Sequence, residues 1–135
     1  MIVVDTNILA YLYLPGPHAN ACQRLLQHDS EWAAPSLWRS EFCNTLLLYL
    51  RKKLISRKYC AEAISAATAL IGRHSFTPNA NEVIELAMAS DCTAYDCEFI
   101  AVARSLATIL VTEDKALLRA FPKDAMTMAK DLARR

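Results

Sequence analysis

Short apolar runs alternate along the chain with longer segments in which apolar residues recur at helical spacing. The short runs are β-branched or are followed by proline, as is typical of buried parallel strands. They occupy residues 2–4, 32–34, 75–77 and 108–111, and residues 125–128 fit an edge strand. Helical segments are expected at residues 6–14, 19–28, 37–53, 57–72, 79–89, 93–106 and directly after Asp114. Strands that alternate with helices predict an α/β domain, with a parallel β-sheet of four to five strands flanked by helices on both faces.

Residues with strong backbone preferences mark several helix ends. The sequence Pro15-Gly16-Pro17 ends the first helix, because proline cannot continue the helical hydrogen bonding. Ser36 is predicted to cap the long helix that begins at residue 37, and Ser56 and Thr93 are predicted to cap two later helices. The tail after residue 128 is polar, and no further element is predicted there.

The size and charge of the chain limit the classes of protein to which it can belong. Its 135 residues suit one domain over residues 1–135, and a hydrophobic content of 54% allows a sizeable core. The chain has 15 basic and 14 acidic residues, and this net charge of +1 does not indicate a large phosphate-binding surface. Nucleic-acid binding is not excluded, since charges can be segregated on one face.

The cysteines and the amino terminus indicate an ordinary reducing environment. Five cysteines without a CxxC pair, and three scattered histidines, give no support for zinc or disulfides. Most of the cysteines are expected to act as small buried apolar side chains. The opening MIVVDTN lacks the basic region of a signal peptide, and the apolar residues 42–50 are too few to span a bilayer. We therefore expect a soluble, cytoplasmic protein with no membrane attachment.

Four carboxylates are expected to meet at one edge of the sheet. The carboxyl end of a strand and the amino end of the following helix lie at the same edge, where open parallel sheets bind ligands. Asp5 follows the first strand, and Asp114 follows the strand that ends at Val111. Glu41 and Asp96 lie in the first turns of two helices that point the same way. These four acids are therefore the candidate catalytic residues.

Each carboxylate also has a purely structural interpretation. Asp5 and Asp114 could cap the helices that follow them, and taken alone this explains them as well as catalysis does. Asp96, taken alone, is explained more simply by its favourable position in the helix dipole. Glu41 resists such an explanation, because it lies in a helix so apolar that several of its faces must be buried. Most other acids, Asp131 among them, are assigned to turns, loops or solvated faces.

Clustered carboxylates point to a hard divalent cation. Buried ionised carboxylates are costly unless a cation compensates them, and without one some of their pKa values should rise as a coupled set. Oxygen ligands without His or Cys select Mg²⁺ or Mn²⁺ over zinc. One such ion can activate an attacking water, and a second can stabilise the leaving oxygen of a phosphodiester. The pattern therefore predicts metal-dependent phosphodiester hydrolysis without a covalent nucleophile, leaving 5′-phosphate and 3′-hydroxyl ends.

The segments that carry these acids resemble a known family. They are VVDTNILAYL, SEF, AYDCEFIAVA and ILVTEDKALL, and the resemblance covers the chain from Asp5 to Leu117. In this order they resemble the PIN domain, and most of all the VapC-type toxins of type II toxin–antitoxin pairs. The resemblance implies a single PIN-like domain in which Asp5, Glu41, Asp96 and Asp114 bind Mg²⁺ or Mn²⁺ and cleave RNA.

The same resemblance implies supporting residues and partners. Asn7 or Thr6 would support Asp5, and Thr112 would hold Asp114. The substrate would be RNA, often a tRNA or rRNA loop, and the chain would form a homodimer. A cognate antitoxin would inhibit it by placing a side chain, often Arg, in the acidic site. At three positions, none of them acidic, the residue differs from the types frequent in the family: Cys97, Phe99 and Leu117. These differences bear on the choice of substrate and not on activity.

Two surface features have both a structural and a functional interpretation. A group of cations suits a solvated helix terminus or, alternatively, a track for an RNA backbone: Arg51, Lys52, Lys53, Arg57 and Lys58. Arg39, close to Glu41 in sequence, is the candidate substrate contact. Residues 46–50 carry more apolar surface than one core-facing stripe needs. Packing within the chain explains this plainly, and a groove for an antitoxin helix or a dimer contact at Leu47 and Leu48 is the alternative.

The leading function hypothesis is an endoribonuclease toxin. One alternative is a PIN-like nuclease that processes RNA, or acts on DNA, without an antitoxin. Another is a catalytically silent module that only binds RNA or protein. The intact set of four carboxylates argues against the silent module, because a module without chemistry needs no such costly cluster.

Overall fold

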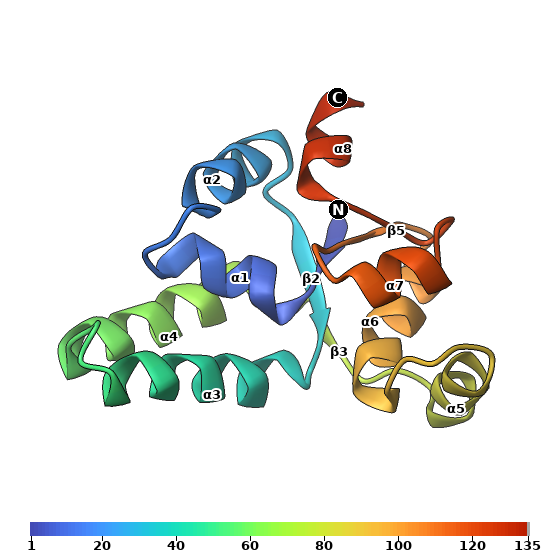
Figure 1. Ribbon diagram of the computed structural model, residues 1–135, viewed down its shortest axis with the longest axis horizontal. Helices are drawn as coiled ribbons and strands as arrows, with labels where there is room; N and C mark the ends of the chain where they lie inside the picture. Colours follow the sequence, from blue (N-terminus) through green and yellow to red (C-terminus); the bar gives the residue numbers. More distant parts are fainter. Residues whose placement is uncertain (135) are drawn as a thin grey trace.

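The computed structural model describes residues 1–134, and its centre is a parallel sheet in the order β3-β2-β1-β4-β5 (Figure 1). Val3 in the central strand pairs with Ala33 on one side and Leu110 on the other. All four strand pairings in this described part are parallel. The strands are β1 Ile2–Val4, β2 Trp32–Pro35, β3 Ser75–Phe76, β4 Leu110–Val111 and β5 Ala125–Met126. The predicted α/β fold with a parallel sheet of four to five strands is confirmed.

Helices cover both faces of the sheet. One face carries α1 Thr6–Tyr13, α2 Ala19–His28, α3 Trp38–Arg51, α4 Arg57–Ile71 and α8 Met128–Ala133. The other face carries α5 Ala80–Met88, α6 Ala94–Ser105 and α7 Lys115–Ala120. Figure 1 shows the two groups on opposite sides of the strands. The sheet is therefore buried on both faces, as its apolar strands require.

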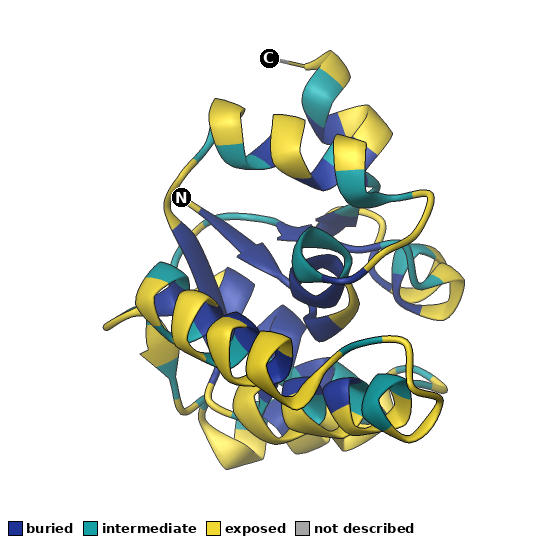
Figure 2. Cartoon of the chain, turned by 90° about the vertical axis from the view of Figure 1, so that its left-hand side faces the viewer, coloured by how far each residue is buried: buried dark blue, intermediate teal, exposed yellow. Residues whose placement is uncertain are grey.

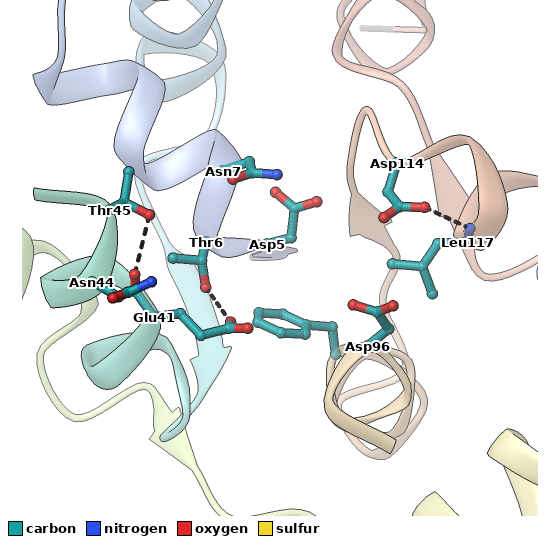
Figure 3. A pocket seen from close by; sticks show the side chains of 10 residues that line it. Asp5, Thr6, Asn7, Glu41, Asn44, Thr45, Asp96, Asp114 and Leu117 are labelled. Atoms are coloured by element: carbon teal, nitrogen blue, oxygen red, sulfur yellow. Dashed lines mark hydrogen bonds between the residues drawn. The ribbon is translucent and has the colours of Figure 1, made fainter. Parts of the chain in front are cut away.

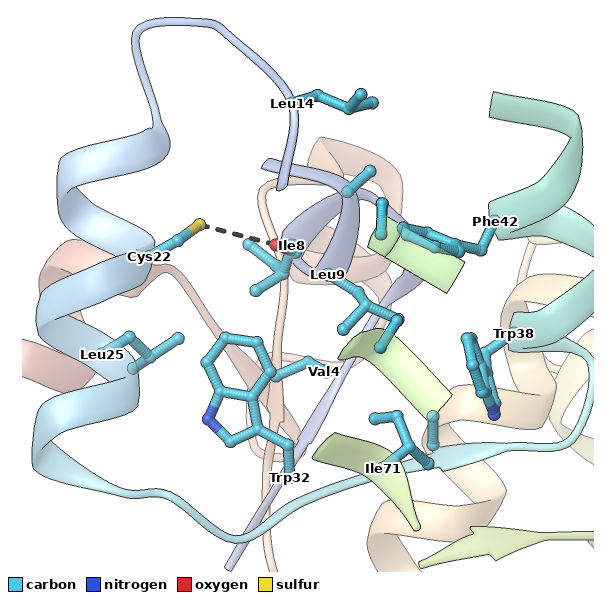
Figure 4. Close-up of a cluster of buried hydrophobic side chains, with 14 of the residues drawn as sticks. Val4, Ile8, Leu9, Leu14, Cys22, Leu25, Trp32, Trp38, Phe42 and Ile71 are labelled. Carbon is cyan, nitrogen blue, oxygen red and sulfur yellow. Dashed lines mark hydrogen bonds between the residues drawn. The ribbon is translucent and has the colours of Figure 1, made fainter. Parts of the chain in front are cut away.

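Alternating side chains of the strands build two cores. Ile2 and Val4 enter the core under α1 to α4, whereas Val3 enters the core under α5 and α6. This follows from the twofold period of a strand, which sends successive side chains to opposite faces. Figure 4 shows the first core, in which the fully buried Trp32 lies between Leu25 and Val4. In Figure 2 the strands are buried while the outer faces of the helices are exposed.

Two predicted local features differ in the structure. Ser36 does not cap α3, because the helix begins at Trp38 and its N-cap, Leu37, makes no side-chain hydrogen bond. The strand predicted at residues 108–111 is shorter, because Ala107 has φ 52° and the chain has only just left α6. The caps predicted at Ser56 and Thr93 are confirmed, since each hydroxyl accepts a backbone N–H bond.

The carboxyl-terminal tail corrects the sequence prediction most. The edge strand predicted at residues 125–128 ends at Met126, and the tail expected to be polar and irregular forms α8. Thr127 caps this helix by accepting from the backbone N–H of Lys130. Asp131, assigned to the solvated residues, is 0% exposed, and its Oδ1 accepts from Arg134 Nε at 2.9 Å. The helix has only six residues, so too few apolar positions recur in the sequence to predict it.

The cysteine prediction holds for most positions. Cys22, Cys60 and Cys97 are buried, whereas Cys43 is exposed, and all five thiols are free. Across residues 1–134, none of the helices has the length and apolar character needed to cross a membrane.

The buried face of α6 provides a test of the core. Ile100→Ala, at a position 0% exposed, should lower the free energy of unfolding by about 2–5 kcal/mol, because it leaves a cavity. Ile84→Ala on α5, where the side chain is 57% exposed, is the matched control and should change it by less than about 0.5 kcal/mol. Urea unfolding followed by circular dichroism measures both, and equal losses would contradict the assignment of the core.

Candidate functional site

A pocket of about 210 Å³ opens at the carboxyl edge of the sheet (Figure 3). It brings together the four carboxylates proposed from the sequence, although they come from four separate segments. The residues that line it are Asp5, Thr6, Asn7, Glu41, Asn44, Thr45, Asp96, Phe99, Asp114 and Leu117. The parallel topology explains the convergence, because β1 and β4 are neighbours and end at the same edge.

Asp5 is held firmly at the end of β1. It is the N-cap of α1, and its Oδ1 accepts from the backbone N–H of Ile8 at 2.9 Å. Its Oδ2 accepts a hydrogen bond from the Thr112 hydroxyl. The side chain is 7% exposed and still lines the pocket. The capping and site interpretations of Asp5 are therefore compatible, since one oxygen caps the helix.

Asp114 is held in a similar way at the end of β4. It caps α7 through a bond from the Leu117 backbone N–H to Oδ1 at 3.0 Å. Its own backbone N–H donates to Thr112 Oγ1 at 3.0 Å. Thr112 is fully buried and contacts both Asp5 and Asp114, so one hydroxyl links the two acids.

Glu41 and Asp96 approach from the helices on the two faces of the sheet. The Thr6 hydroxyl donates to Glu41 Oε1 at 2.7 Å, which fixes that carboxylate against the start of α1. Asp96 lies in the first turn of α6, half-buried, where Thr93 caps the helix. Asn7 is exposed, and Figure 3 shows its amide close to Asp5 at the pocket.

Burial and like charges raise the pKa values of Asp5 and Asp96. Burial raises the pKa of Asp5 to about 6, against the lowering effect of the Thr112 and Ile8 hydrogen bonds. A smaller part of this rise comes from the charges of Asp114 and Glu41. The pKa of Asp96 is also raised, first by burial and then by the charge of Asp114. The acids therefore sense one another electrostatically, which is the effect expected of a shared anionic pocket.

The donor chemistry of the pocket suits a hard cation. Its polar lining consists of carboxylate, hydroxyl and amide groups, and oxygen donors of this type are the ligands of Mg²⁺ and Mn²⁺. Among residues 1–134, no three His, Cys, Asp or Glu side chains come close enough to hold one ion. Asp5, Glu41 and Asp114 instead each accept a hydrogen bond from the chain.

Several lining residues were not found from the sequence. Asn44 and Thr45 follow Glu41 by three and four positions, which places all three on one side of α3. Polar residues at this spacing in an apolar helix are a signal that could have revealed them. Glu98 lines a separate hollow beside α5, and burial and then the charge of Glu41 raise its pKa.

Arg39 lies elsewhere. It is exposed and lines a separate pocket with Trp38 and Thr68, so the structure does not bring it to the carboxylates. Its sequence distance of two residues from Glu41 sends its side chain to a different side of the helix.

The parallel sheet with an acidic pocket at its carboxyl edge defines the class of small α/β domains that present converging carboxylates to a ligand. Within that class, the chain belongs to the PIN domain family, whose model matches residues 2–122.

Individual proteins resemble this chain in sequence or in structure at low sequence identity. Ribonuclease VapC3 of Pyrobaculum aerophilum is 24% identical over 124 residues, which cover 90% of this chain and 95% of that protein. The crystal structure of PAE2754 from Pyrobaculum aerophilum has a TM-score of 0.77 at 22% identity, over 98% of this chain and 87% of that one. The crystal structure of FitAcB from Neisseria gonorrhoeae has a TM-score of 0.75 at 15% identity, over 96% and 99%.

The raised pKa of Asp5 predicts a pH-dependent stability. Because this pKa is about 6 in the folded chain and 3.8 ordinarily, protonation of Asp5 favours folding. That stabilisation is complete below pH 3.8 and is lost as the pH rises through about 6. Asp5→Asn cannot ionise, so in EDTA it should raise Tm by several degrees at pH 8 and by clearly less at pH 5. Thermal unfolding at both pH values measures this, with the exposed Asp91→Asn as control, and an equal gain at both would contradict it.

Proposed function

We propose that this chain is a divalent-metal-dependent endoribonuclease and the toxin of a toxin–antitoxin pair. The observation that carries the proposal is the pocket in which Asp5, Glu41, Asp96 and Asp114 converge with raised pKa values for two of them. Membership of the PIN domain family and the similarity to Ribonuclease VapC3 support RNA as the substrate.

The four carboxylates would hold Mg²⁺ or Mn²⁺ partly through bound waters, because within residues 1–134 no three of them lie close enough to ligate one ion directly. When bound, such an ion supplies an activated water and stabilises the developing charge on a phosphodiester. The chain's own groups set the geometry, since the Ile8 N–H and the Thr112 hydroxyl orient Asp5. Thr6 orients Glu41, and the amides of Asn7 and Asn44 at the rim can donate hydrogen bonds to phosphate oxygens.

Cleavage of RNA tests the enzyme directly. Purified protein with Mg²⁺ or Mn²⁺ should cut total cellular RNA into discrete fragments, and EDTA should abolish the cutting. Asp5→Asn and Asp114→Asn should each reduce the rate by at least about a hundredfold, because each removes a charge from the metal site.

The matched control is Asp91→Asn, which neutralises an exposed acid outside the pocket. Its rate should equal that of the unaltered chain. Fragments that persist in EDTA, or in the Asp5→Asn protein, would reject the metal-dependent mechanism. No cleavage by a folded, partner-free sample would instead favour a module that only binds RNA or protein.

The proposed antitoxin requires a surface that can receive it, and α3 offers one. Leu47 and Leu48 are 37% and 49% exposed near the carboxyl end of α3, which gives the helix an apolar outer face. An apolar face of this kind suits an amphipathic helix of a partner. The same face would serve the homodimer that we propose for the free toxin.

Coexpression tests this partner. The product of a small upstream gene should copurify with the chain and block RNA cleavage. Leu47→Lys or Leu48→Lys should weaken the complex at least tenfold by burying a charge in the contact. Ile84→Lys, at an apolar site on α5 that is 57% exposed, should leave it unchanged. An unaltered complex with folded Leu47→Lys and Leu48→Lys proteins would exclude this face.

A further inference from the structure

A second, smaller pocket lies where the turn between α1 and α2 meets α3. This aromatic hollow has a volume of about 90 Å³ and is lined by Tyr11, Leu14, Pro15, Pro17, His18 and Tyr49. The rings of Tyr11 and His18 are stacked, with centroids 4.4 Å apart and an interplanar angle of 26°. His18 begins α2 without a capping hydrogen bond from its side chain, so its ring is held by this stack.

The aromatic hollow continues from the carboxylate pocket along the same two helices. Asn7 and Tyr11 are four residues apart on α1, and Thr45 and Tyr49 are four residues apart on α3. A spacing of four residues is about one helical turn, or roughly 5.4 Å along the axis. α1 and α3 pack against each other. The two pockets therefore follow one another along the seam between α1 and α3, about one helical turn apart.

Electrostatics agrees with this placement. After burial, the charges of Asp5 and Glu113 are the next causes that raise the pKa of the Tyr11 hydroxyl. The hydroxyl therefore lies within electrostatic reach of the carboxylate at the end of β1. Beyond the hollow, Lys52 follows Tyr49 by three residues and is exposed, so a cation continues the seam on the same side of α3.

The hollow has the chemistry of a nucleobase site. Proline and leucine give apolar walls, while the stacked pair offers an aromatic face on which any base can stack. Within residues 1–134, the Tyr11 and Tyr49 hydroxyls and the His18 imidazole form no hydrogen bond with the rest of the chain. Half-buried polar edges without partners suit the edge of a base.

We propose that the aromatic hollow is a subsite for one unstacked base of the strand whose backbone crosses the carboxylate pocket. The identity of that strand as RNA rests on the proposed function. The subsite would select where the strand is cut, because it fixes one base about one helical turn from the acidic centre.

Binding of short RNA tests the subsite without relying on cleavage. All proteins carry Asp5→Asn, so that the probe is not consumed. The probes are a fluorescent RNA hexamer of random sequence and a hexamer of abasic ribose phosphates with the same charge. Fluorescence anisotropy should show that the RNA hexamer binds about tenfold more tightly than the abasic one, and that His18→Ala removes this difference.

Matched variants separate stacking from stability. His18→Phe should restore the preference for bases, because it restores an aromatic face. His74→Ala is the control. His74 also stacks on an aromatic ring, that of Phe76 in β3, but it does not line the aromatic hollow. Tyr49→Ala provides a second test of the hollow if His18→Ala fails to fold.

The binding of the two hexamers decides whether the aromatic hollow is a base subsite. Equal binding of both hexamers, or an equal loss of both in His18→Ala, would overturn the subsite. The subsite would also be overturned if His18→Ala weakened only the complex with the coexpressed partner, which would assign the hollow to a protein. Base-dependent binding by a chain that never cleaves RNA would uphold the subsite and reject the proposed nuclease.

Discussion

Repulsion among carboxylates gathered at one edge of the sheet is the constraint on which the rest of the site depends. Asp5 is nearly buried, and burial together with the charges of Asp114 and Glu41 raises its pKa to about 6. An arrangement of this kind persists only if the surrounding chain holds it. Here the Ile8 N–H, the Thr112 hydroxyl and the amino end of α1 do so. As a consequence, the charged form of Asp5 is destabilised until a cation compensates it.

The parallel topology makes such a gathering possible. Because β1 lies between β2 and β4, the segments that follow all three strands start from one edge. Thr112 then links Asp5 and Asp114 with a single buried hydroxyl, while Thr6 links the start of α1 to Glu41 on α3. The aromatic hollow lies one helical turn further along α1 and α3, so the proposed catalytic and base-binding functions share two helices. Fold and function are therefore coupled through the packing of α1 against α3.

Sequence reasoning found what strong local patterns determine. The alternation of strands and helices in the sequence predicts the sheet, and the strand ends predict that Asp5 and Asp114 lie at its carboxyl edge. Features that depend on tertiary contacts were missed. Helix α8 and the burial of Asp131 arise from packing on α2. The apolar pattern of a six-residue helix is too short to predict such packing. Ser36 faces Thr77 instead of capping α3, and Arg39 turns to another pocket, because helical phase alone decides where each side chain points.

The central claim is that the converging carboxylates form a divalent-cation site, and direct binding of Mn²⁺ tests it most simply. Electron paramagnetic resonance measures the free ion as it is titrated into the protein in the absence of RNA. The unaltered protein should bind Mn²⁺ saturably, with an affinity that Asp5→Asn weakens at least tenfold and that Asp91→Asn leaves unchanged. No binding by the unaltered chain, or equal binding by the Asp5→Asn protein, would contradict it.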